Sequence, residues 1–261
     1  MYIHVYFIYL FNYFYIICYK GQKNPSLLPM IKTQNWIPDE LHILLRIADI
    51  LFECFFNEIT TRKNFQNEIL HEIEQIMKDI KVHFEFFAPK TSGGKWTWKS
   101  LMGPAKKTIL EKFPVNTFIL GEHGQKIELL WREFYRLYCV IKKENITFDE
   151  IDEFEKDAKN WVRLFCRPAI FCQKQIIQEG IYRATDVTPY IHVFAQHVPQ
   201  FMRQLKQRGL SFRHFTTSSI EKKNHEQVSI FNLKFQLTFT KFLLNIGKVI
   251  LWWNFNGWWK T

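Results

Sequence analysis

The chain has 261 residues, enough for one large domain or two small ones with a substantial core. Its 35 Lys and Arg residues against 25 Asp and Glu residues give a net charge of +10, which favours polyanionic partners such as nucleic acid or an anionic membrane surface. The five cysteines are odd in number and contain no Cys-x-x-Cys pair. This pattern argues against a disulfide framework or a self-contained zinc ribbon and indicates a reducing compartment.

Both ends of the chain are rich in aromatic residues. Residues 2–19 contain no acid, Lys or Arg and are just long enough to cross a membrane, but they lack the basic n-region and small-residue cleavage site of a signal peptide. Residues 231–261 share the bias toward amino acids specified by AT-rich codons. We favour poorly selected sequence at both ends around an older domain. A membrane anchor through residues 2–19, or a buried strand or helix there, stays open.

Between these ends the sequence predicts a mainly α domain. Residues 1–20 form the N-terminal segment, residues 21–37 contain Gly and Pro as in a linker, and the folded domain is expected over 38–230. The apolar periodicity predicts helices over 38–55 and 65–80, followed by a short strand over 82–86 and a turn at 91–94. Pro38, with Asp39 and Glu40 behind it, suits the first turn of a helix.

Further helices are expected along the rest of the domain. The first covers 99–113, and its outer face carries Lys106, Lys107 and Lys112. After a loop at 121–124, a long amphipathic helix covers 127–141, and a helix over 147–165 follows with Thr147 and Glu150 as a capping box. A helical stretch then runs from Pro168 toward Arg183, and Pro189 opens the next helix. A turn at Gly209 precedes another helix that begins at Glu221.

His192 and His197 are the first candidates for chemistry. A step of five residues turns an ideal helix by about 500°, which leaves the two side chains about 140° apart rather than on one face. Spacing alone therefore favours two half-buried histidines over a zinc site, although Pro199 removes a helical hydrogen bond and would kink the segment.

Two acidic segments are the next candidates. Glu221, followed by Lys222 and Lys223, is typical of a solvated helix start, with a metal-binding carboxylate beside DNA phosphate as the functional alternative. The Asp39-Glu40-Leu41-His42 segment is expected to match the helix dipole rather than to bind metal. The sequence has no glycine-rich phosphate loop, Gly-x-Ser-x-Gly elbow or Cys/His nucleophile arrangement, which excludes the hydrolase and nucleotide-kinase classes.

Taken in order, several segments resemble the C-terminal half of a DDE transposase core. They are Pro38-Asp39-Glu40-Leu41-His42, Lys99-Ser100-Leu101-Met102, the long helix around Trp131 to Tyr138, Tyr190-Ile191-His192 with His197-Val198-Pro199, and Glu221-Lys222-Lys223-Asn224. The most similar lineage contains the Transib transposases and the vertebrate recombination-activating recombinase. The resemblance spans roughly residues 36–230, and its most specific part is His-x4-His-Val-Pro followed by a Glu 24 residues after the second histidine.

The resemblance implies an RNase H-like core with a helical insertion, three carboxylates that hold two Mg²⁺ or Mn²⁺ ions, and a zinc ion held by a Cys-x-x-Cys pair and two histidines. Glu221 matches the third catalytic acid, and His192 and His197 match the histidine half of the zinc site. The two catalytic aspartates and the cysteine pair have no match, and no residue in 1–37 is acidic. The expectation is thus a truncated core without most of its sheet.

We therefore expect a nuclear or cytoplasmic, transposase-derived protein that binds DNA and does not cleave it alone. The residues expected to contact DNA are Arg203, Arg208, Arg213, Lys222 and Lys223. Two alternatives stay open, a helical protein-interaction or regulatory module and a basic protein anchored in a membrane through residues 2–19. Self-association into a homo-oligomer also stays open.

Overall fold

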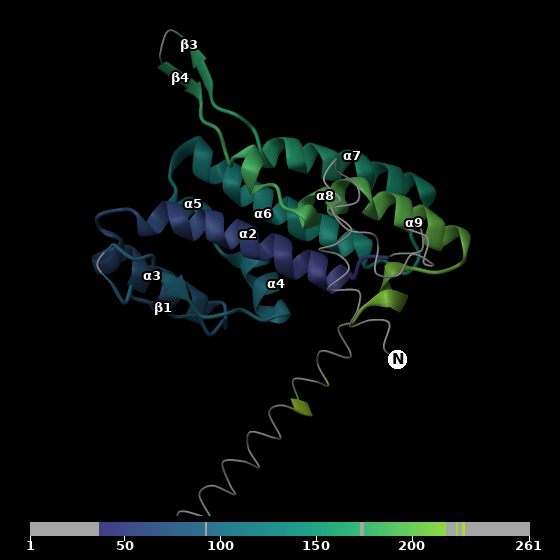
Figure 1. Cartoon of the computed structure of the whole chain (residues 1–261), viewed down its shortest axis with the longest axis horizontal. Coiled ribbons are helices and arrows are strands. Elements are labelled where there is room, and N and C mark those ends of the chain that lie inside the picture. Colours follow the sequence, from purple (N-terminus) through teal and green to yellow (C-terminus); the bar gives the residue numbers. More distant parts are fainter. Residues whose placement is uncertain (1–36, 92, 173–174, 218–222, 224–225, 228–261) are drawn as a thin grey trace, which may run out of the picture. The chain divides into compact units, whose positions relative to one another are not determined.

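The computed structural model describes residues 37–91, 93–172, 175–217, 223 and 226–227. The chain divides into two compact units, Met1–Thr216 and Thr217–Thr261, and most of the described residues belong to the first. In this unit helices predominate (Figure 1), which confirms the predicted mainly α class. The N-terminal segment 1–20, the linker 21–37 except its last residue, and the tail 231–261 lie outside the described residues.

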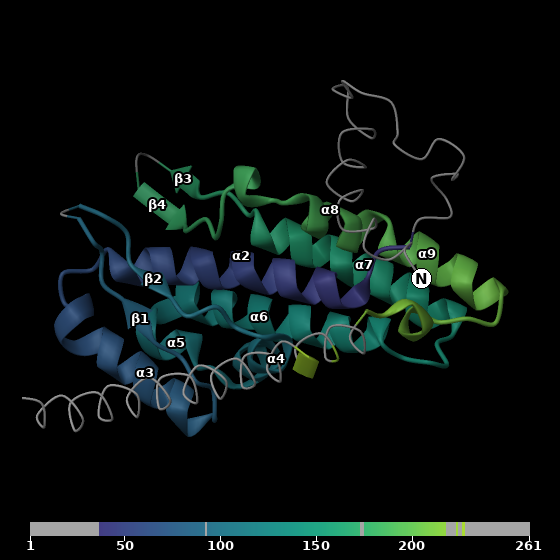
Figure 2. The same ribbon diagram turned by 60° about the horizontal axis from the view of Figure 1, so that its bottom comes forward.

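Helix α2 (Glu40–Thr60) runs through the middle of the first unit, with α7 and α8 on one side and α3, α4 and β1 on the other (Figures 1 and 2). It begins where the sequence predicts, because the Asp39 carboxylate accepts a hydrogen bond from the Leu41 amide at 3.2 Å and so caps the first turn. Its buried residues span almost the whole length from Leu41 to Ile59, as expected for a central helix.

The next segment is a helix followed by a small hairpin. The predicted helix is confirmed, although it opens with a π-helical turn, Phe65–Ile69, before α3 (Leu70–Asp79). Strand β1 (Phe86–Phe87) pairs antiparallel with β2 (Thr97–Trp98). Val82 and Phe84 are buried without belonging to the strand, so the predicted strand is shorter than expected. The turn between the strands is confirmed by Gly93, which has a φ of +77°.

Helices α4 (Gly103–Lys112), α5 (Val115–Phe118) and α6 (Gly121–Ile141) correct two predictions. Lys106 does not lie on an outer face, because α4 packs against α2 and buries this side chain to 4% exposure. Its ammonium group donates to the Asp49 carboxylate at 2.5 Å and to the Leu45 carbonyl at 3.1 Å. The loop predicted at 121–124 is instead the first turn of α6.

After α7 (Phe148–Phe165), which is capped by Thr147 and Glu150 as predicted, the chain forms a second hairpin. Strands β3 (Ile170–Cys172) and β4 (Gln175–Gln178) pair antiparallel, so the helical stretch predicted from Pro168 toward Arg183 is wrong. A short apolar run suits a strand as well as a helix, and only tertiary context decides between them. The hairpin projects away from the helices in Figure 1.

The described part ends with helices that pack on α2 and α7. A 3-10 turn, Ala184–Asp186, leads into α8 (Pro189–Gln196), and α9 (Val198–Gln207) follows it directly. Gly209 has a φ of +69° and makes the predicted turn, after which comes a second 3-10 turn, Phe212–Phe215. Among the described residues no helix is long and apolar enough to cross a membrane, and residues 2–19 lie outside them.

The core of the first unit is built largely from aromatic rings. Trp131 on α6 is fully buried, and its ring centroid lies 5.0 Å from that of Phe52 and 5.5 Å from that of Phe55. Phe113 stacks on Phe118 with centroids 5.5 Å apart. Tilted and edge-on aromatic pairs of this kind add to the gain from burying apolar area. The Phe-rich composition therefore serves the packing of this unit.

Candidate functional site

The two predicted zinc histidines lie at the junction of α8 and α9. Helix α8 ends at Gln196 and α9 begins at Val198, with His197 between them at φ −105° and ψ −34° and Pro199 in the first turn of α9. An uninterrupted helix would hold the two side chains about 140° apart. The break instead brings the rings together, with centroids 5.2 Å apart and an edge-on arrangement.

This histidine pair has the chemistry of half a metal site. Burial lowers the pKa of His192, and the charge of His197 lowers it further, so His192 favours the neutral form that binds metals. Within the described ranges no group of three or more His, Cys, Asp or Glu side chains is placed to hold a metal ion. The described residues thus supply two ligands, whereas a structural zinc normally needs four.

The two acidic candidates, Glu221 and Asp39, have different outcomes in the structure. Glu221 and Lys222 lie outside the described residues, and Lys223 is an exposed helical residue of the second unit. Asp39 caps α2, and its second carboxylate oxygen lies 2.5 Å from the His42 imidazole. This confirms that Asp39 suits a helix start.

Two of the three predicted DNA-binding arginines are held in ion pairs. The Arg203 guanidinium lies 2.5 Å from the Asp152 carboxylate and 2.6 Å from that of Glu155. Arg213 pairs with Glu144. Acidic neighbours compensate the charge of these side chains, which lowers their attraction for phosphate. Arg208 is exposed at the end of α9.

Two lysines, unlike Arg203 and Arg213, have no ion-paired carboxylate among the described residues. Lys107 on α4 and Lys142, which follows α6, place their ammonium nitrogens 5.2 Å and 5.7 Å from the centre of the Tyr138 ring. These distances are typical of cation–π contacts. Burial lowers the pKa of Lys107, the nearby charge of Lys142 lowers it further, and the charge of Glu40 opposes the shift. The two ammonium groups therefore repel each other across one aromatic ring.

No carboxylate of the described part of the chain forms an ion pair with Lys107 or Lys142. The Tyr138 side chain beneath them is 1% exposed, and burial together with the neighbouring Glu40 carboxylate raises the pKa of its hydroxyl. Two adjacent ammonium groups without counterions can bind an anion such as a phosphate oxygen. Each lysine belongs to a Lys-Lys dipeptide, 106–107 or 142–143. These dipeptides are the sequence signal by which the pair could have been found.

Comparisons of the chain with protein-family models, with curated proteins and with solved structures find no match. The transposase resemblance therefore rests on the ordered motifs of the sequence alone, and inference about function has to start from the geometry of the histidine and lysine pairs.

Proposed function

We propose that the chain is a helical DNA-binding protein derived from a DDE transposase, and that Lys107 and Lys142 contact the phosphate backbone. The observation that carries the proposal is the placement of two ammonium groups, one from α4 and one from the residue that follows α6, over one ring without an ion-paired carboxylate in the described residues. A phosphate between them would relieve their mutual repulsion and release counterions from the DNA. Because the groups are already in place, little side-chain entropy is lost on binding.

Two further observations support this proposal. The net charge of +10 favours association with a polyanion at long range. The ring centroids of His192 and His197 lie 5.2 Å apart. The transposase resemblance implies that these two side chains lie close together as ligands of one zinc ion. Contacts to phosphate carry no base information, so the binding is expected to tolerate changes of DNA sequence.

The test is the salt dependence of DNA binding, measured by fluorescence anisotropy with a labelled duplex. The double variant Lys107→Gln/Lys142→Gln should flatten the plot of log K against log[salt] by about two units, roughly one for each lost phosphate contact. Lys90→Gln/Lys95→Gln is the matched control, since it removes the same charge from two exposed lysines near the β1–β2 turn. Equal slopes for the two double variants would refute the proposed contact.

Two additional variants separate this surface from the residues singled out by sequence. Lys222→Gln/Lys223→Gln tests the contacts expected beside Glu221 and should also lower the slope. Arg203→Gln should change it little, because Asp152 and Glu155 already neutralise this guanidinium. A large loss of slope in Arg203→Gln would move the interface to α9.

A helical protein-interaction module is the second candidate function, and the β3–β4 hairpin favours it. Ile170 and Phe171 are 50% and 63% exposed on the hairpin that projects in Figure 1. Exposed apolar side chains beside unpaired strand edges are typical of protein contacts. Sedimentation of the pure chain distinguishes the two functions, because apolar self-association through the hairpin persists at high salt and is lost in Phe171→Ser.

A further inference from the structure

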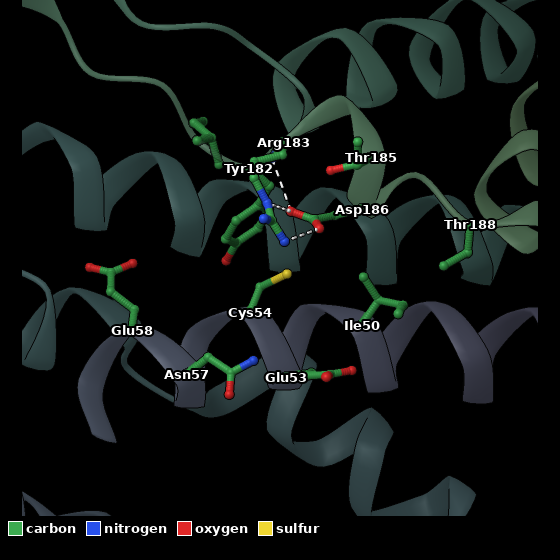
Figure 3. Close-up of a pocket in the computed structure, with 11 residues that line it drawn as sticks. Ile50, Glu53, Cys54, Asn57, Glu58, Tyr182, Arg183, Thr185, Asp186 and Thr188 are labelled. Carbon is green, nitrogen blue, oxygen red and sulfur yellow. Dashed lines mark hydrogen bonds and ion pairs between the residues drawn. The ribbon is translucent and has the colours of Figure 1, made fainter. Parts of the chain in front are cut away.

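A covalent modification site needs an accessible nucleophile, and the Cys54 thiol does not meet this requirement. A groove of about 440 Å³ lies between α2 and the segment that precedes α8. Figure 3 shows the Cys54 side chain in this groove, pointing toward the segment that carries Arg183 and Asp186. Burial raises the pKa of the thiol to about 12, with the charges of Asp186 and Glu53 adding to the shift. Cys54 therefore stays protonated near neutral pH and is a poor nucleophile.

The Lys107 side chain has the neighbours that make a lysine nucleophilic. Its nitrogen lies 5.2 Å from the centre of the Tyr138 ring, and the Lys142 nitrogen lies 5.7 Å from the same centre. Two ammonium groups over one ring repel each other, and loss of a proton from one of them relieves the repulsion. Burial and then the charge of Lys142 lower the pKa of Lys107, although the charge of Glu40 opposes the shift. The free amine, which is the form that attacks electrophiles, is therefore more abundant at Lys107 than at an ordinary lysine.

The adjacent Lys106 shows that access matters as well. Burial lowers the pKa of Lys106 too, but this residue is only 4% exposed and its nitrogen donates to the Asp49 carboxylate at 2.5 Å. A reagent cannot reach a nitrogen held in this way. Lys107 is only half-buried, and the described residues give it no ion-paired carboxylate. Lys107 thus combines a reactive amine with access from solvent.

We propose that Lys107 is an acylation site for acyl phosphates, and that Lys142 is a positioning residue that holds the phosphate of the donor. An ammonium group attracts a phosphate oxygen strongly. The Lys107 nitrogen attacks the acyl carbon and forms an amide bond. The bond from the acyl carbon to the phosphate oxygen breaks, phosphate leaves with the electron pair, and the nitrogen releases its proton to water. The acyl phosphate is the only co-reactant, and nothing is oxidised or reduced.

The test is acetylation of the full, nucleic-acid-free chain with acetyl phosphate, with the rate at each lysine measured by peptide mass spectrometry. Lys107 should be acetylated several-fold faster than the exposed Lys90 and Lys95. The buried Lys106 should react most slowly. These lysines are internal references, because all of them meet the same reagent in one reaction. Acetylation of Lys107 no faster than that of Lys90 and Lys95 would overturn the proposal.

Two substitutions of Lys142 test the role of its charge. Lys142→Gln removes both the repulsion and the phosphate contact, so acetylation of Lys107 should slow toward the rate of Lys90. Lys142→Arg keeps the positive charge and should preserve most of the rate. Lys143→Gln is the matched control, since it removes one positive charge from the next residue, whose ammonium group donates to Glu150 at 2.8 Å. Equal rates in Lys142→Gln and Lys142→Arg would remove Lys142 from the site.

A second acyl donor separates the two effects of Lys142. The N-hydroxysuccinimide ester of acetic acid is uncharged, so its reaction depends on the amine and not on attraction of a phosphate. The preference for Lys107 over Lys90 should therefore be larger with acetyl phosphate than with the ester. Equal preferences with the two donors would contradict the phosphate contact at Lys142.

The effect of the modification on DNA binding rests on the proposed DNA contact. An amide carries no charge, so acetylation of Lys107 should lower the salt slope of DNA binding by about one unit, as for the loss of one phosphate contact. Lys107→Arg, given the same treatment, keeps its charge and should keep this unit of slope. The two proposals fail separately. Slow acetylation of Lys107 overturns the modification site, whereas fast acetylation with an unchanged slope supports that site and refutes the DNA contact.

Discussion

Gly124 shows how closely two elements approach each other. A Cβ atom at this position would lie 1.5 Å from the Ile119 carbonyl oxygen and 2.6 Å from its carbon. Only glycine permits this contact between the first turn of α6 and the residue that follows α5. The first turn of α6 therefore has a glycine for reasons of packing, although glycine lowers the intrinsic preference for a helix.

Gly124→Ala should destabilise the first unit by at least about 2 kcal/mol, because overpacking against backbone forces the helix to shift. Urea unfolding followed by circular dichroism measures the change. Gly103→Ala is the matched control, since its Cβ would meet the Leu41 side chain at an ordinary 3.4 Å. Similar stabilities of the two variants would show that the α5–α6 contact adjusts without cost.

Glu150 predicts a dependence of stability on acid pH. Its hydrogen bonds to the Lys143 ammonium group and to the Thr147 backbone lower its pKa from 4.5 to about 2. A carboxyl group whose pKa is depressed in the folded state stabilises the fold above its unfolded pKa. That contribution is lost as the pH falls from 4.5 toward 2.

Glu150→Gln should therefore reduce the loss of stability over this pH range, measured by urea unfolding at a series of pH values. Glu153→Gln, on the exposed side of the same helix, is the control. An identical pH profile for Glu150→Gln and the unaltered chain would mean that the capping box contributes no pH-dependent stability.

The residues predicted correctly from sequence act through local contacts. Asp39 and Thr147 cap helices by binding amides two or three residues away, so the pattern of nearby residues reveals them. Lys106 and Gly124 differ, because Lys106 is positioned by Asp49, 57 residues away, and Gly124 by the path of the preceding turn. The Lys107–Lys142 pair likewise forms only when α4 packs on α6.

At the scale of elements, the break between α8 and α9 matters most. The sequence contains the cause, Pro199, but the direction of the bend depends on how both helices pack against α7. Helical periodicity alone predicts well-separated histidines, whereas the structure brings their rings together. The β3–β4 hairpin is the other element that periodicity missed, since its apolar run is too short to distinguish a strand from a helix.

The histidine pair predicts weak zinc binding. Two imidazoles are half of a structural zinc site, so the purified chain should lose its zinc on dialysis against a mild chelator. Metal analysis before and after dialysis, with His192→Ala and the exposed His83→Ala for comparison, measures this. One tightly held zinc per chain that disappears only in His192→Ala would contradict the prediction, and Cys166 and Cys172 would be the next ligands to test.

At the scale of the whole molecule, the mainly helical class was predictable and the packing was not. Long amphipathic patterns give α2, α6 and α7, although α2 ends five residues later and α6 begins six residues earlier than predicted. The groove between α2 and residues 181–188 depends on contacts between distant segments, and no spacing in the sequence indicates it. The net charge of +10 likewise does not indicate which cations remain without a carboxylate partner after folding.

Catalysis is the prediction that tests the whole molecule. Two-metal cleavage of DNA needs several carboxylates that hold ions about 3.5–4 Å apart, and in this sequence only Glu221 matches an acid of the transposase triad. Asp39 and Asp49 do not replace the others, because Asp39 caps α2 and Asp49 binds the Lys106 ammonium group. The 261-residue chain should therefore neither nick nor join DNA in Mg²⁺ or Mn²⁺, and Glu221→Gln should leave that result unchanged. Nicking of a supercoiled plasmid by the pure chain, abolished by Glu221→Gln, would show that further carboxylates complete the site, and Asp39 and Asp49 would then be the first to substitute.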